Sequence, residues 1–207
     1  MNRTLKVLGL ALTSVLVFSA VVAASASATT TFTAESPATL TVSANETQVF
    51  SYTAGGAQVK CTGVSADETA ISGTSATEIT VHPTFTGCIG PGGITGHTTY
   101  NGGCDLLFTV SGQVHICPNG GSITMVVTGL CTYHLGPQTV STVTYDNIGS
   151  GTTREIKLTP SVTGISATNT NPGFLCGPES STTGTYSGSL TITGENGAGQ
   201  HIGLSTD

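Results

Sequence analysis

The chain has 207 residues, of which five are basic and eleven acidic, and only 8% are charged, against about 25% in an ordinary globular domain. Threonine, serine and glycine take the place of the missing charges. A chain with a formal net charge of −6 cannot neutralise a row of phosphates, which argues against nucleic acid as a partner.

The first residues have the three parts of a secretory signal peptide. Arg3 and Lys6 supply a basic start, residues 7–24 are apolar or small, and residues 24–28 read Ala-Ser-Ala-Ser-Ala, with two overlapping A-x-A cleavage sites. A retained membrane anchor is the alternative, because about 18 apolar residues just span a bilayer. The small-residue tail and the lack of a basic stop favour cleavage after Ala28. We therefore predict a signal peptide over 1–28 that leaves Thr29 as the new N-terminus.

The predicted mature protein is a single domain over residues 29–207. Its 179 residues are enough to bury a proper core, and no later segment is long and apolar enough to be an integral membrane segment. Both basic residues of the signal are lost, so three basic residues remain against eleven acidic ones, a formal charge of −8. We expect a secreted, extracellular protein, released or held non-covalently at the cell envelope.

Period-two alternation of apolar and polar residues recurs along the mature chain and predicts β-strands. Between 78 and 85, Ile79, Val81, Pro83 and Phe85 share one face. Similar patterns cover 122–127, 131–135, 156–158 and 186–192. Less regular strands are expected at 39–43, 48–53, 58–64, 105–111, 114–117 and 138–145.

Glycine-rich turns separate these runs, and Asn-Gly pairs supply the positive φ angles of tight hairpins. No window has a sustained helical period. Ten to twelve short strands at this spacing predict an all-β fold, a disulfide-stabilised antiparallel β-sandwich, with a β-barrel as the alternative. Residues 168–183 are the least strand-like segment, with Cys176 as their expected tether.

The six cysteines all lie in the mature part, and an even count in an exported chain indicates disulfides. No C-x-x-C motif supports a zinc ribbon or a redox site. Fifteen pairings are possible. Our hypothesis pairs Cys117 with Cys131 across neighbouring strands and Cys61 with Cys88 around a two-strand run, which leaves Cys104 with Cys176. The cysteines are Cys61, Cys88, Cys104, Cys117, Cys131 and Cys176.

No catalytic or metal site is predicted, and no cofactor is implied. The five histidines form no H-x-H pair, the spacing that places two ligands on one face of a strand, and the acidic residues lack the arrangement that glycoside hydrolysis needs. Sugar-binding sites usually present exposed aromatic rings, yet the chain has no tryptophan. Tyr100 and His97, expected in a loop over 97–101, are the candidate ligand-binding residues.

The order of local motifs resembles a loose group of uncharacterised secreted proteins from actinobacteria. The resemblance covers most of the mature chain and is most specific around the cysteines. It implies secretion and a bacterial source, and it carries over no functional residues. The motifs are FTAESPATLT (32–41), VKCTGV (59–64), VHPTFTGC (81–88), NGGCDLLF (101–108), HICPNGG (115–121), CTYHLGPQTV (131–140), GFLCG (173–177) and GTYSGSLTITG (184–194).

These observations together predict a non-catalytic structural or interaction protein of the extracellular space or cell envelope. The partners considered are a cell-wall glycan or another envelope protein. An extracellular carbohydrate-binding module is the first alternative and a secreted hydrolase the second.

Overall fold

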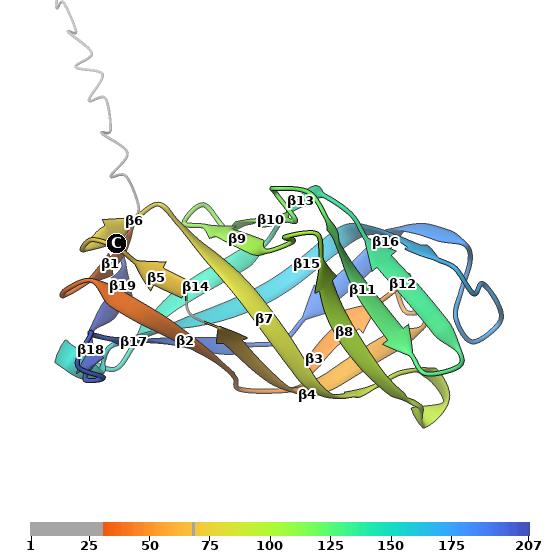
Figure 1. Ribbon diagram of the computed structural model, residues 1–207, viewed down its shortest axis with the longest axis horizontal. Helices are drawn as coiled ribbons and strands as arrows, with labels where there is room; N and C mark the ends of the chain where they lie inside the picture. The colour runs from red at the N-terminus through yellow and green to blue at the C-terminus, as the bar shows by residue number, and fades with distance from the viewer. Residues whose placement is uncertain (1–30, 68) are drawn as a thin grey trace, which may run out of the picture.

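The computed structural model describes residues 31–67 and 69–207, so the predicted signal peptide lies outside the described residues. In the described part, regular structure is almost entirely β, with two single-turn 3₁₀ helices at Pro91–Gly93 and Gly151–Thr153 (Figure 1). The strands are β1 (Phe32–Ala34), β2 (Ala38–Ala44), β3 (Gln48–Ser51), β4 (Gln58–Asp67), β5 (Thr69–Ile71), β6 (Ser75–Ala76), β7 (Glu78–Ile89), β8 (Thr95–Asn101), β9 (Leu106–Thr109), β10 (Gln113–Ile116), β11 (Ser122–Val127), β12 (Cys131–Leu135), β13 (Gln138–Ser141), β14 (Val143–Ile148), β15 (Glu155–Asn169), β16 (Ser180–Ser187), β17 (Leu190–Glu195), β18 (His201–Ile202) and β19 (Leu204–Thr206).

The alternation seen in the sequence coincides with the burial pattern of the strands. In β7, Ile79, Val81 and Pro83 are buried while Thr80 and His82 are exposed. The apolar positions of β11 and β12 are buried in the same way. Burial of one face of each strand removes apolar surface from water at about 25 cal/mol per Å², and this is the main force holding the sheet together. The buried side chains form a single core cluster.

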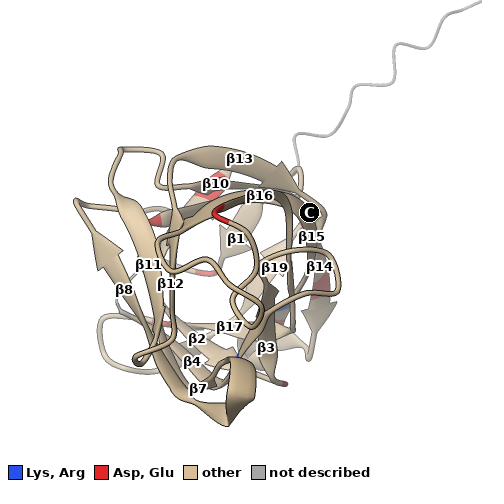
Figure 2. Cartoon of the chain, turned by 90° about the vertical axis from the view of Figure 1, so that its right-hand side faces the viewer, with Lys and Arg blue, Asp and Glu red and all other residues tan. Residues whose placement is uncertain are grey.

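The fold is an antiparallel β-sandwich whose sheet curls back on itself. Every strand pair among the described residues is antiparallel. Backbone pairing runs from β4 through β7, β8, β11, β12, β15, β16 and β3 back to β4, and the end-on view shows the resulting ring-like wall (Figure 2). The core fills the space inside this wall.

The long axis of the molecule separates two different ends (Figure 1). The connections β3–β4, β7–β8, β11–β12 and β15–β16 lie together at one end, which we call the four-loop end; it comprises residues 52–57, 90–94, 128–130 and 170–179. The small sheet β19-β1-β6 closes the opposite end. The described ends of the chain meet there, where the backbone N–H of Asp207 donates to the carbonyl of Thr31 at 3.1 Å.

The structure has more strands than the ten to twelve expected, for three physical reasons. The additional short strands are only two or three residues long and carry too little alternation to be recognised. Two expected strands are divided: 138–145 at Thr142, whose positive φ of 84° turns the chain from β13 into β14, and 186–192 at Gly188, between β16 and β17. Third, segment 97–101, expected as a loop, belongs to β8 (Thr95–Asn101), in which glycine and threonine occupy two of the three inward positions.

All three disulfides of the described chain are formed, and only one matches the predicted pairing. Cys61 and Cys88 are bonded, as predicted, and face each other directly across β4 and β7. The predicted pairs Cys117–Cys131 and Cys104–Cys176 are wrong: the bonds are Cys104–Cys117 and Cys131–Cys176. The reason is that β11 runs between Cys117 and Cys131, so Cys117 lies before the first residue of the strand while Cys131 pairs with its last residue, Val127, at the four-loop end.

Three disulfides and no free cysteine in the described chain indicate an oxidising compartment, since cytosolic thiols are kept reduced. Within residues 31–67 and 69–207, no helix has the length and apolar character needed to cross a membrane.

Candidate functional site

The structure separates the two residues predicted to bind a ligand. In β8, positions 96, 98 and 100 face inward, with the side chains of Thr98 and Tyr100, and alternate with exposed positions, among them His97. Tyr100 is half-buried and packs against the core. Because adjacent strand residues face opposite sides of a sheet, Tyr100 and His97 do not form one site. The expectation that Tyr100 is an exposed loop aromatic is wrong.

Tyr100 stands at a seam in the wall of the sandwich. Strands β7 and β8 pair only at Cys88–Gly96 and Ile89–Thr95; further along, β7 pairs with β9 instead. The ring of Tyr100 lies across this divergence, with its centroid 4.9 Å from that of His82 on β7. Its hydroxyl is buried and has no hydrogen-bond partner among the described residues. Burial, followed by the nearby Tyr186 and the charge of Asp105, raises the pKa of Tyr100 well above 10.

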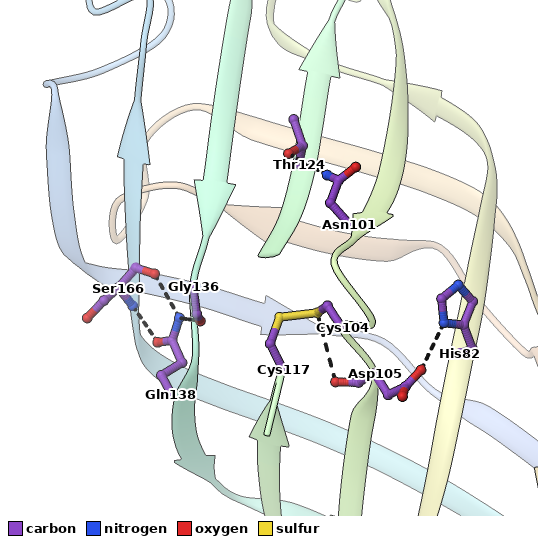
Figure 3. The surroundings of a disulfide bond; sticks show 9 residues. All are labelled: His82, Asn101, Cys104, Asp105, Cys117, Thr124, Gly136, Gln138 and Ser166. Carbon is purple, nitrogen blue, oxygen red and sulfur yellow. Dashed lines mark hydrogen bonds and ion pairs between the residues drawn. A yellow bond between two sulfur atoms is a disulfide. The ribbon is translucent and has the colours of Figure 1, made fainter. Parts of the chain in front are cut away.

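A hydrogen bond and a disulfide lie at the start of β9, beside His82 (Figure 3). His82 Nδ1 lies 2.9 Å from Asp105 Oδ1, and Asp105 follows Cys104, which is bonded to Cys117. The side chains of this His–Asp pair are 45% and 28% exposed, so even with a protonated imidazole the pair adds little stability. Among the described residues, no hydroxyl or thiol hydrogen-bonds to His82, so the pair lacks the nucleophile partner of a hydrolytic triad.

The most unusual surface feature lies at the four-loop end. Phe174 is 103% exposed and Leu175 is 49% exposed, side by side at the tip of the β15–β16 connection. Two further exposed apolar residues, Ile89 and Ile94, flank the β7–β8 turn at the same end. A single exposed apolar residue is ordinary. A fully solvated phenylalanine beside a second large apolar side chain is less common, which makes this turn the candidate functional site.

The backbone around Phe174 is held in one conformation. Residues Gly173 and Gly177 form a β-bridge, in which each N–H donates to the carbonyl of the other at 2.9 and 2.8 Å, and the N–H of Cys176 donates to Gly173 O at 3.1 Å. Gly177 has φ +83°, and a Cβ there would lie 3.0 Å from the ring of Tyr52. Only glycine can adopt this positive φ angle and also leave room for the tyrosine ring without strain.

The base of this turn is anchored in the core. Cys176 is 3% exposed and bonded to Cys131. Its carbonyl accepts hydrogen bonds from the Tyr133 hydroxyl at 3.2 Å and the Asn169 amide at 3.1 Å. Burial, then the neighbouring Tyr52, raises the pKa of Tyr133 to about 12, so its hydroxyl remains a donor at all physiological pH values. The tether expected at Cys176 is thus present, with Cys131 as its partner.

Charged residues are sparse around the four-loop end, as the end-on view shows (Figure 2). No lysine or arginine follows Lys157 in the sequence, so the β15–β16 connection has no basic residue, and it carries a single acidic one, Glu179. In the part of the chain that the structure describes, no three histidine, cysteine, aspartate or glutamate residues lie close enough together to hold a metal ion.

Sequence reasoning passed over Phe174 and over the His82–Asp105 pair. The signal for Phe174 was present, because two large apolar residues stand in a segment of Asn, Pro and Gly that has no strand pattern to bury them. His82 and Asp105 are 23 residues apart, and only the pairing of β7 with β9 brings them together.

No known protein family, curated protein or solved structure matches the chain.

Proposed function

We propose that the chain is a secreted, non-catalytic interaction protein of the extracellular space or cell envelope, and that it engages a partner protein through the four-loop end with Phe174 as its anchor. The observation that carries the proposal is the full exposure of Phe174 on a turn locked by three backbone hydrogen bonds and braced by Cys131–Cys176. A rigid apolar anchor loses little conformational entropy on binding. Aromatic anchors of this kind dominate the energetics of protein interfaces.

The chemistry of the turn favours a protein with an apolar pocket over a lipid surface. Loops that insert into anionic membranes combine apolar tips with basic residues. Here the turn has no basic residue, and the predicted mature chain carries eleven acidic residues against three basic ones. A partner with a neutral or basic rim around an apolar pocket fits this charge distribution.

Secretion is supported by two independent features. The first 28 residues have the composition of a cleavable signal, and the three disulfides need an oxidising compartment. The described N-terminal end lies beside Asp207, away from the four-loop end. An attachment near either terminus would therefore leave Phe174 accessible.

Photo-crosslinking tests the proposal. The mature, disulfide-bonded protein carries benzoylphenylalanine at position 174, or at the exposed Ala198 of the opposite end as control, and is incubated with the envelope fraction of the secreting cells. We expect a discrete protein adduct at position 174 only. Unlabelled wild-type protein should compete it away, and Phe174→Ser should compete at least tenfold more weakly, because burying a phenylalanine contributes about 2 kcal/mol.

Phe174→Ser provides its own folding control. Since Phe174 is surrounded by solvent, the substitution should leave the melting temperature unchanged. Adducts that wild type fails to displace, or that Phe174→Ser displaces equally well, would overturn the proposal. Binding to purified cell-wall glycan that depends on Phe174 would replace it with the carbohydrate-binding alternative, which no longer has Tyr100 as an exposed platform.

A further inference from the structure

The four-loop end holds a groove as well as the Phe174 turn. The groove has a volume of about 440 Å³ and lies between the β3–β4 loop and the β7–β8 turn. Glycine backbone, Ala57, Gln58, Ile89 and Pro91 line it, and Lys60 is its single charged residue. A benzene ring needs a cavity of about 150 Å³, so a phenylalanine side chain fits within this groove.

Lys60 gives the groove a positive charge that nothing in the described chain neutralises. Its side chain is exposed, and the ion pair of the described residues is the one between His82 and Asp105. The other two basic residues of the predicted mature chain are Arg154 and Lys157, which lie toward the opposite end, where Arg154 O accepts from Leu204 of the closing sheet. The groove is therefore an apolar pocket with a basic rim, the kind of surface that fits the Phe174 turn.

The Phe174 turn carries the opposite charge. Glu179 follows Phe174 by five residues, is exposed, and is the single acidic residue of the β15–β16 connection. It too has no ion-pair partner among the described residues. The net negative charge of the mature chain opposes contact between two copies over most of their surface, whereas at the four-loop end a glutamate and a lysine are both available for pairing.

The turn and the groove lie on either side of the β3–β4 loop. Gly177, at the base of the turn, packs against the ring of Tyr52 at the start of this loop, and Gly56 and Ala57 at its end line the groove. Anchor and groove thus belong to one end of the molecule (Figure 1). Two copies that meet end to end about a two-fold axis place each anchor opposite the groove of the other, and such a contact closes on itself as a dimer.

We propose that the partner bound by the four-loop end is a second copy of this chain. Phe174 of each copy enters the groove of the other, beside Ile89, and Glu179 of each copy pairs with Lys60 of the other. This inference rests on the proposed function and names its partner. In the dimer the two small closing sheets, with the described chain ends, face outward.

Sedimentation velocity of the purified, mature, disulfide-bonded protein over a concentration series tests the proposal. We expect dimers whose fraction rises with concentration. Phe174→Ser should weaken the dimer by about a hundredfold or more, because two phenylalanines are buried in each dimer and each contributes at least about tenfold. The melting temperature of this variant should stay unchanged, since Phe174 is surrounded by solvent in the single chain.

Charge reversal tests the docking itself. Lys60→Glu and Glu179→Lys should each weaken the dimer by about tenfold, because each puts like charges opposite one another. The double variant should regain the affinity of the wild-type protein, since it restores both pairs with their signs exchanged. Lys157→Glu is the matched control: it changes the net charge as Lys60→Glu does, but away from the four-loop end, and should leave the dimer intact.

A protein that stays monomeric over the whole series would overturn the proposal. So would dimers that Phe174→Ser leaves unchanged, or a double variant that associates no better than Lys60→Glu and Glu179→Lys do singly. A monomeric protein in which position 174 still crosslinks to a different envelope protein would overturn the second-copy assignment and leave the proposed function standing. The absence of any protein contact that depends on Phe174 would overturn both.

Discussion

Alkaline pH is predicted to unfold this protein through its tyrosines. All five tyrosines have a pKa raised above 10, with burial as the first cause in each. A buried phenolate would lose its hydration, and the hydrogen bonds donated by Tyr52, Tyr133, Tyr145 and Tyr186 exist only while their hydroxyls are protonated. The native state therefore holds these protons more tightly than the unfolded chain does.

The sign and size of the change in unfolding free energy follow from the difference in tyrosine pKa between the folded and unfolded states. An unfolded tyrosine ionises with a pKa near 10, while Tyr133 in the folded protein has a pKa of about 12. Its contribution to stability is complete below pH 10 and is lost as the pH rises through 12. The loss from Tyr133 alone is about 1.4 kcal/mol at pH 11 and approaches about 2.7 kcal/mol above pH 12. The other four tyrosines act in the same direction, against a total stability of about 5–15 kcal/mol for a typical domain.

Urea unfolding at pH 8, 10 and 11, together with absorbance at 295 nm, measures this effect. We expect the free energy of unfolding to fall steeply above pH 10, with phenolate absorbance appearing only as the fold is lost. Tyr133→Phe should reduce the fall in the free energy of unfolding between pH 10 and 11 by about 1 kcal/mol, at a cost of about 1 kcal/mol at pH 8 for the lost hydrogen bond to Cys176 O. Ionisation of the tyrosines near pH 10 with native circular dichroism intact would refute the reasoning.

Three other predictions concern stability and processing. Replacing both cysteines of Cys131–Cys176 by alanine should lower the free energy of unfolding in urea by about 4 kcal/mol, and the same change at Cys104–Cys117 should lower it by about 3 kcal/mol. The reason is that the two bonds close loops with separations of 45 and 13 residues. An unchanged free energy of unfolding after either removal would contradict this. Gly90→Ala should destabilise by about 1–3 kcal/mol, since its Cβ would overlap the side chain of Val127. Gly73→Ala is the control: its Cβ meets nothing within 4 Å, so it should change the melting temperature little. Mass spectrometry of the culture medium should find the mature N-terminus at Thr29, and a chain retaining residues 1–28 would show that the signal peptide is misassigned.

The parts of the fold that the sequence predicted are those that depend on local alternation. In β7, β11 and β12 one face is apolar and the other polar, so the buried side chains, such as Ile79 and Met125, could be identified without knowing the neighbouring strands. Strand β8 could not be recognised in this way, because Gly96 and Thr98 occupy inward positions that carry no hydrophobic signal. For the same reason the burial of Tyr100 could not be predicted. Its surroundings depend on where β7 diverges from β8, and not on the residues of its own segment.

The disulfide pairing shows where local reasoning fails and what would have corrected it. Cys117 precedes β11 and Cys131 follows it, so a strand of six residues separates them by about 20 Å, far beyond the roughly 7 Å that two bonded cysteines allow between Cα atoms. The strand directions place Cys104 and Cys117 together near the start of β11 and Cys131 beyond its end, where Cys176 also lies. That assignment brings the segment 170–179 to the four-loop end, with Cys176 fixed in the core. Phe174, two residues from a tethered cysteine and with no strand to bury it, would then have been the predicted contact residue.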